Sequence, residues 1–123
     1  MSKIMIVEDD QTTVKLLSFL LKKKNYTVVS VPNGRRAVED ASKEMPDLIL
    51  MDVMMPEMDG IEATEIIKSD GKTASIPIII LSALGQEMEV MKGLQSGADG
   101  YVVKPFDSQA LLRLIEEKIL SAS

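Results

Sequence analysis

The sequence predicts an α/β fold in which five parallel strands form one sheet with helices packed on both faces. Apolar runs that suit strands alternate along the chain with segments of helical periodicity, and short loops join them. Most of these runs are continuously apolar, as expected for strands that are covered on both faces. Strand, helix, strand units close right-handed into a parallel sheet, so we expect a doubly wound, three-layer sandwich.

The predicted strands differ in their polar pattern, and this difference suggests their order. They are expected near residues 3–7, 27–31, 48–52, 77–82 and 100–103. The segment 27–31 alternates polar and apolar residues more than the others, which is typical of an edge strand. Of the common doubly wound orders, the flavodoxin-like order 2-1-3-4-5 suits five strands and places the second strand at an edge.

Two helices are predicted in the first half of the chain. The first, near 12–24, has Val14, Leu17 and Leu21 at helical spacing, and its last turn is rich in lysine, which suits the negative end of a helix dipole. The turn 32–34 leads into a second helix, which is expected to carry the apolar residues Ala37, Val38, Ala41 and Met45.

Three further helices are predicted in the second half. Asp59 followed by Glu62 resembles an aspartate-based capping box and opens a helix near 60–69. Another helix is expected near 86–95. Asp107 or Ser108 caps the last helix, in which apolar residues again recur at helical spacing.

The composition limits the possible functions. A chain of 123 residues has the size of one domain, so we expect residues 1–123 to fold as a unit. The net charge of −5 argues against direct binding to nucleic acid, because that affinity depends on clustered Lys and Arg.

The chain contains no Cys and no His, which excludes disulfides, thiol chemistry, histidine-ligated zinc and a histidine base. Any phosphohistidine must therefore come from a partner. No apolar run approaches the roughly 18 residues of a membrane span, and the N-terminal residues do not resemble a signal peptide. We expect a cytoplasmic protein without membrane insertion.

Polar side chains follow four of the predicted strands. Glu8 and Asp9 come after the first strand, Asp52 closes the third, and Ser82 and Lys104 stand at the ends of the fourth and fifth. Parallel strands end at the same edge of a sheet, and ligands of doubly wound folds bind at that edge. The two acids are therefore expected opposite Asp52, with Ser82 and Lys104 beside it.

Crowded carboxylates repel one another, and a divalent cation would remove the conflict. Mg²⁺ prefers oxygen ligands and binds through one or two carboxylates together with a substrate phosphate. We interpret Glu8, Asp9 and Asp52 as a metal site, whereas Asp10 is interpreted as the cap of the next helix.

An aspartate in such company can attack phosphorus and form an acyl phosphate. Lys104 would neutralise the phosphoryl oxygens, and Ser82 would donate a hydrogen bond to them. Each of these two residues alone has an ordinary structural explanation, as a solvated strand end or a helix cap. The prediction depends on their joint occurrence with Asp52.

Taken together, these residues resemble the receiver domain of two-component response regulators, of the single-domain kind found in chemotaxis. The resemblance covers the whole chain. The family's motif positions are filled in order by Glu8-Asp9, Asp52, Pro56, Gly60, Ser82-Ala83, Gly97-Ala98-Asp99-Gly100-Tyr101 and Lys104-Pro105-Phe106.

The resemblance implies a Mg²⁺ requirement, with Mn²⁺ as a possible substitute, and a metal ligand at the backbone carbonyl of Met54. It implies that Asp52 receives a phosphoryl group from a histidine kinase, a histidine phosphotransfer protein or a small phosphodonor. The chain would then be a signalling switch and not an enzyme, since it would catalyse only its own phosphorylation and dephosphorylation. A cis peptide bond between Lys104 and Pro105 is implied as well.

The resemblance also implies how the switch works. Ser82 would move toward the phosphoryl group and Tyr101 would turn inward, which changes the face formed by the fourth helix, the fifth strand and the fifth helix. That face would bind a downstream target protein or a fused output domain. Met88, Val90 and Met91 of the fourth helix are predicted either to fill the core or to contact a partner.

Two positions differ from the better-known chemotaxis pattern. Met54, two residues after Asp52, and Leu84, two residues after Ser82, are both apolar. In the family these positions border the path of the hydrolytic water. We therefore expect the phosphoryl group to persist longer here than in fast-cycling receivers.

Three alternative functions share part of this pattern. A metal-dependent phosphohydrolase would need a second acid where Met54 stands, and a flavodoxin-like electron carrier would need a phosphate-binding loop where Glu8 and Asp9 stand. A third alternative is a receiver that only binds partners, but the key side chains are all present. Whether the chain stands alone or belongs to a larger regulator is left open.

Overall fold

Strands and helices alternate without exception in the computed structural model, which describes residues 2–53 and 58–122. The five strands are β1 Lys3–Val7, β2 Thr27–Val31, β3 Leu48–Met51, β4 Ile78–Ser82 and β5 Gly100–Val103. The five helices are α1 Gln11–Lys23, α2 Gly34–Glu44, α3 Gly60–Ser69, α4 Glu87–Gln95 and α5 Ser108–Ala122.

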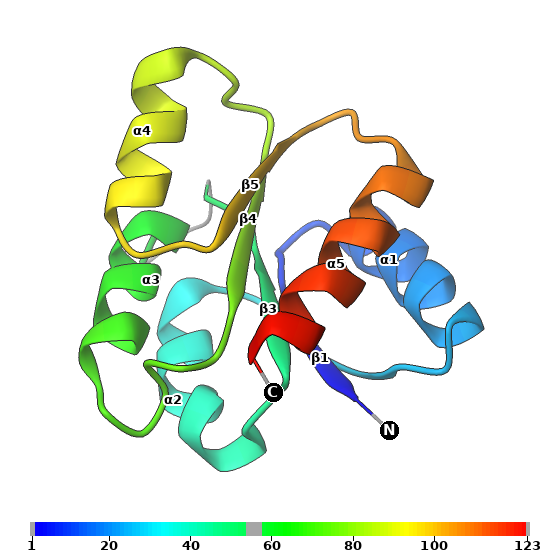
Figure 1. Ribbon diagram of the computed structural model, residues 1–123, viewed down its shortest axis with the longest axis horizontal. Helices are drawn as coiled ribbons and strands as arrows, with labels where there is room; N and C mark the ends of the chain where they lie inside the picture. The colour runs from blue at the N-terminus through cyan, green and yellow to red at the C-terminus, as the bar shows by residue number, and fades with distance from the viewer. Residues whose placement is uncertain (1, 54–57, 123) are drawn as a thin grey trace.

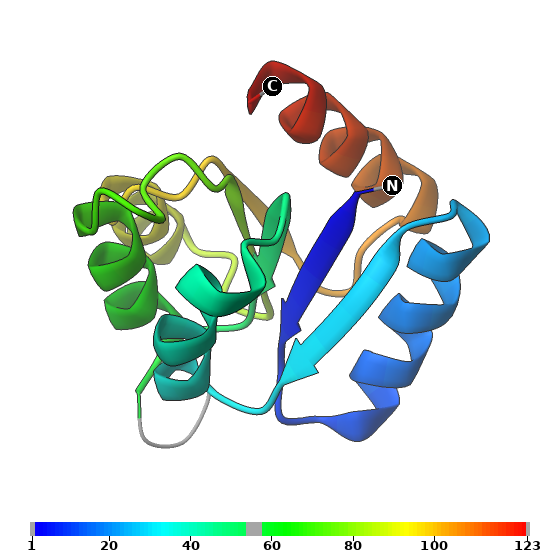
Figure 2. The same ribbon diagram turned by 90° about the horizontal axis from the view of Figure 1, so that it is seen from below.

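All strands are parallel and lie in the order β2-β1-β3-β4-β5, as the sequence predicts. Helices α1 and α5 cover one face of this sheet, and α2, α3 and α4 cover the other (Figure 1). Figure 2 shows the same separation from below. The doubly wound, three-layer architecture is therefore confirmed.

Two apolar clusters fill the two faces of the sheet, because successive side chains of each strand point to opposite sides. Ile4 and Ile6 of β1 pack with Leu17 of α1 and Ile115 of α5. Met5 and Val7 of the same strand pack instead in the cluster with α2 and α3. Since both faces are buried, the strand is continuously apolar.

The helix ends follow the predicted caps, with small differences in length. Asp59 accepts a hydrogen bond from the amide of Glu62 at 2.9 Å and opens α3, and Asp107 accepts one from the amide of Gln109 at 3.0 Å where α5 begins. The prediction for Met45 is wrong. This residue follows α2 in a left-handed conformation, with φ of 44°, and its side chain is 51% exposed.

Backbone hydrogen bonds fix the segments that follow the strands. The amide of Asp52 donates to the carbonyl of Val7 at 3.0 Å, so the end of β3 is tied to the end of β1. The amide of Gly60 donates to the carbonyl of Val53 at 3.0 Å, which brings the start of α3 against the same segment. A Cβ atom at Gly60 would lie only 2.1 Å from the carbonyl oxygen of Asp52.

We predict that Gly60→Ala lowers the free energy of unfolding by about 2–3 kcal/mol, because two backbone segments would have to separate. Gly71→Ala is the matched control, since a Cβ atom there meets nothing within 4 Å. Urea unfolding of both variants measures the difference. Equal stabilities would show that the close approach at Gly60 is unimportant.

Candidate functional site

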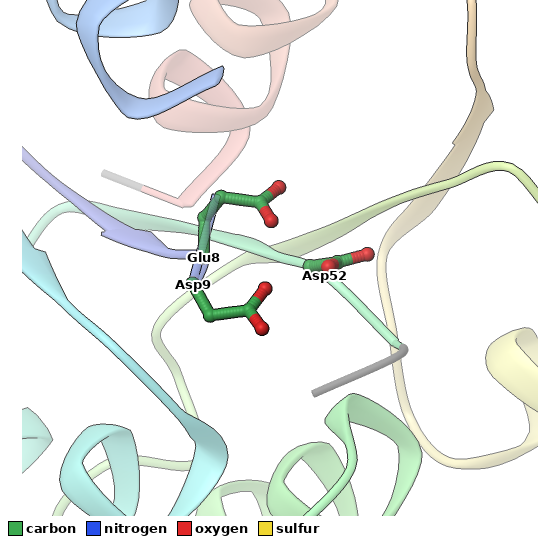
Figure 3. A group of neighbouring side chains, drawn as sticks. All are labelled: Glu8, Asp9 and Asp52. Carbon is green, nitrogen blue, oxygen red and sulfur yellow. The ribbon is translucent and has the colours of Figure 1, made fainter. Parts of the chain in front are cut away.

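Three carboxylates meet at the carboxyl ends of β1 and β3. Oxygen atoms of Glu8, Asp9 and Asp52 all lie within 4.8 Å of one another, and the side chains of Glu8 and Asp9 extend toward the side of Asp52 (Figure 3). Glu8 is 4% exposed and Asp52 is 8% exposed, whereas Asp9 lies at the surface. The predicted convergence of these acids is confirmed.

The surroundings of Asp52 favour its protonated form. Burial, followed by the negative charge of Glu8, raises the pKa of Asp52 from 3.8 to about 6, and the positive charge of Lys104 opposes this rise. In the absence of a cation, Asp52 therefore carries a carboxyl group that resists ionisation. The single positive charge of Lys104 does not balance the negative charges of the carboxylates around it.

The donor set at this site fits a hard divalent cation. The cluster offers only carboxylate oxygens, which are the ligands that Mg²⁺ prefers. Asp9 leaves one side of the cluster open to solvent, which suits a cation that keeps several of its waters. Burial and the negative charge of Glu8 raise the pKa of Asp52, and a cation bound here would favour its ionised form.

Lys104 reaches the cluster from the end of β5. Its Nζ lies 3.0 Å from Oε1 of Glu8 and 3.8 Å from Oδ1 of Asp52. Its backbone amide donates to the carbonyl of Ser82 at 2.8 Å, which fixes the start of this segment against β4. The peptide bond between Lys104 and Pro105 is cis, as the resemblance implied.

Ser82 and Tyr101 are joined through Leu84. The side-chain oxygen of Ser82, which is buried, accepts a hydrogen bond from the amide of Leu84 at 3.0 Å. The hydroxyl of Tyr101 donates to the carbonyl of Leu84 at 2.5 Å. The two residues predicted to form the switch are thus linked by one residue of the loop after β4.

The remaining predicted residues take the following places. Asp10 caps α1, because its carboxylate accepts hydrogen bonds from the amide and the hydroxyl of Thr13. Met88 and Met91 are 68% and 48% exposed, so they do not fill the core, and Val90 is half-buried. The predicted ligand at Met54 lies outside the described residues.

Sequence reasoning missed a structural contact at the opposite edge of the sheet, where β4 and β5 begin. The ammonium group of Lys68 donates to the carbonyls of Ala74 and Ile76 and lies 2.9 Å from the carboxylate of Asp99. Asp99 also accepts a hydrogen bond from the amide of Ile78 at 2.8 Å. A lysine in the last turn of α3 is the only signal in the sequence, and it does not reveal its distant partners.

The comparisons with known proteins agree with this geometry. Residues 4–116 match the family model of the response regulator receiver domain. The chain belongs to this family. It is therefore a receiver domain, the module that response regulators of two-component systems use in signalling.

Similar proteins include whole single-domain chains and parts of longer regulators. The receiver is 37% identical to the protein PilH of Pseudomonas aeruginosa, over 94% of this chain and 95% of that one. It is 38% identical to the DNA-binding transcriptional regulator RpaA of a Synechocystis strain, over 91% of this chain but only 46% of that protein.

One solved structure bears on the acidic cluster. The receiver domain of a sensor histidine kinase from Pseudomonas aeruginosa is 32% identical, with a TM-score of 0.89 over 96% of this chain and 97% of that one. That structure has a magnesium ion coordinated in its active-site cleft. Receiver domains bind Mg²⁺ at an acidic site, and Glu8, Asp9 and Asp52 form such a cluster here.

We predict that Asp52→Asn stabilises the protein at pH 8 in EDTA by about 1–2 kcal/mol, after allowance for solvent screening. The pKa of Asp52 is about 6 in the folded state and 3.8 in the unfolded chain, so the folded state holds this proton more tightly. Stability contributed by the protonated group is present below pH 3.8 and is lost as the pH rises through 6. Asparagine avoids that loss.

Urea unfolding at several pH values between 4 and 8 measures the effect, and the advantage of Asp52→Asn should shrink toward pH 4. Glu117→Gln is the control, because Glu117 is exposed and its neighbour Lys118 lines a pocket with Pro77 and Asp99, at the edge of the sheet opposite to the cluster. A variant less stable than the natural protein across the whole range would contradict the prediction.

Proposed function

We propose that Asp52 is the phosphoacceptor of this receiver and that Lys104 and Ser82 assist the transfer. The supporting observation is the position of the Lys104 ammonium group, 3.0 Å from Glu8 and 3.8 Å from Asp52. One cation beside a nucleophilic carboxylate and a second acid is the arrangement that phosphoryl transfer needs, because charge on the phosphoryl oxygens must be neutralised.

In the proposed reaction, a carboxylate oxygen of Asp52 attacks the phosphorus atom of the donor. A new P–O bond forms as the bond from phosphorus to the leaving group breaks, and the leaving group keeps the electron pair. For a kinase or a phosphotransfer protein, that leaving group is a histidine nitrogen, since this chain has no histidine. Lys104 and the hydroxyl of Ser82 would bind the phosphoryl oxygens.

Glu8, Asp9 and Asp52 would hold Mg²⁺ or Mn²⁺, together with the backbone carbonyl of Met54. The bound cation would neutralise charge on the phosphoryl group and keep Asp52 ionised at neutral pH. Lys104 already lies closer to Glu8 than to Asp52, which leaves Asp52 free to react.

The output would be a change of shape read by another protein. We propose that residues 1–123 act as one receiver domain in the cytoplasm and respond to a histidine kinase. Movement of Ser82 and Tyr101 would alter the face of α4, β5 and α5, where Met88 and Met91 are exposed, and a target protein or an output domain would bind there. None of the helices in the described part of the chain is long and apolar enough to cross a membrane.

In this proposal the chain acts on no other substrate, because it would catalyse only the gain and loss of its own phosphoryl group. Leu84 and Met54 offer no polar group to orient a water molecule for hydrolysis. The acyl phosphate should therefore persist longer than in fast-cycling receivers.

Incubation with acetyl phosphate and Mg²⁺ should add one phosphoryl group, measured by intact mass. Asp52→Asn should add none, because it lacks the nucleophile, and EDTA should prevent the addition to the natural protein. Lys104→Met should slow the addition by roughly 100-fold or more, as expected when a charged donor to the transition state is lost. An adduct that forms equally on Asp52→Asn would refute the proposal.

Introducing a polar group next to the proposed phosphoryl site should shorten the lifetime of the acyl phosphate. We predict that Met54→Asn, which can orient a water molecule, speeds decay by roughly tenfold, a typical gain from a positioned polar group. The decay is followed by mass after removal of acetyl phosphate in Mg²⁺. Rapid decay of the natural protein, with no acceleration in Met54→Asn, would contradict the expected persistence.

A further inference from the structure

Helix α4 approaches strand β5 most closely at a glycine. Gly93 is the one buried residue of α4. A Cβ atom built there would lie 2.7 and 2.8 Å from ring carbons of Tyr101 and 3.0 Å from the side chain of Ile80. Real Cβ atoms essentially never lie less than 3.0 Å from another atom, so any side chain at this position would force the ring of Tyr101 to move, whereas Ile80 would have to give by only a few tenths of an ångström.

Glycine is an unfavourable choice at this position on local grounds alone. Apart from proline, it is the least favourable residue in the interior of a helix, and Gly93 is followed by two more helical residues. Its φ angle is not in the left-handed region, so the backbone does not require glycine. What requires glycine is the space that the ring of Tyr101 occupies.

The ring of Tyr101, which packs against Gly93, belongs to a residue that is connected to the candidate phosphorylation site by hydrogen bonds. The hydroxyl of Tyr101 donates to the carbonyl of Leu84, and the amide of Leu84 donates to the side-chain oxygen of Ser82. Tyr101 and Ile80 are also partners across β4 and β5, so both side chains that face Gly93 belong to one pair of the sheet. The contact path runs from α4 to the hydroxyl of Ser82, at the carboxyl end of the strand that neighbours β3.

We propose that Gly93 is a positioning residue for the reaction at Asp52. Because Gly93 lacks a side chain, the ring of Tyr101 can lie against α4 while its hydroxyl donates to the carbonyl of Leu84. This hydrogen bond keeps the loop after β4 and the hydroxyl of Ser82 in place. The effect on phosphorylation rests on the proposed function of Asp52, whereas the packing of Tyr101 against Gly93 does not.

The packing is tested by melting temperatures of Gly93→Ala in two backgrounds. With Tyr101 present, the substitution should lower the melting temperature by about 3 °C or more, because the ring is displaced. In the Tyr101→Ala background there is no ring to displace. The same substitution should then raise the melting temperature by about 3–5 °C, because alanine favours the helix.

Gly71→Ala is the control for an added methyl group, since it meets nothing within 4 Å, and it should shift both backgrounds equally. A Gly93→Ala shift of the same sign and size in both backgrounds would overturn the proposed packing. That outcome is decisive even if the chain accepts no phosphoryl group.

The effect on the site is tested by the rate of phosphorylation from acetyl phosphate and Mg²⁺. Gly93→Ala should slow it about two- to tenfold, the effect of one ordinary hydrogen bond. In the Tyr101→Phe background the hydroxyl is already absent, so Gly93→Ala should cause no further loss. If Gly93 had a merely structural role, Gly93→Ala would slow phosphorylation equally in the presence of Tyr101 and in the Tyr101→Phe background.

A rate for Gly93→Ala equal to that of Gly71→Ala would overturn the link from Gly93 to Asp52, as would an equal loss in the Tyr101→Phe background. If no variant gains a phosphoryl group, and the natural protein gains none either, the proposed function of Asp52 fails and the link fails with it. The melting temperatures would still decide whether Gly93 makes room for Tyr101.

Discussion

Repulsion among the carboxylates of Glu8, Asp9 and Asp52 is the constraint on which the carboxyl edge of the sheet depends. Their oxygens lie within 4.8 Å of one another, and the burial of Glu8 and Asp52 keeps water from screening the charges. Burial is the larger cause of the raised pKa of Asp52, and the negative charge of Glu8 adds to it. Lys104 relieves part of the repulsion. A divalent cation bound to the carboxylate oxygens would neutralise the remaining negative charge.

The fold maintains this unfavourable cluster with contacts that lie outside it. Hydrogen bonds from Asp52 to Val7 and from Lys104 to Ser82 fix the ends of neighbouring strands, and they do so through the backbone. Gly60 lets the start of α3 come against Asp52. The two apolar clusters thus hold together carboxylates that repel one another and that would separate if they were free to move.

The sequence predicted the sheet and the convergence of Glu8, Asp9, Asp52 and Lys104, because both follow from local patterns. Apolar runs identify the strands, and parallel strands necessarily bring their carboxyl ends to one edge. Met45 was misjudged because helical periodicity does not reveal that the helix has already ended. Contacts between distant segments, such as Lys68 with Asp99 or Gly93 with Tyr101, could not be predicted, because they depend on tertiary packing that leaves no periodic signal.

We propose that Asp52 is a nucleophile whose charge is balanced by Lys104 and a metal ion. The most direct measurement is a crystal structure of the protein with Mg²⁺ and beryllium trifluoride, a mimic of the phosphoryl group. We expect beryllium bonded to a carboxylate oxygen of Asp52, a cation held by Glu8, Asp9 and Asp52, and Lys104 at a fluorine atom. Beryllium trifluoride bonded elsewhere, or a cation bound away from these three acids, would contradict it.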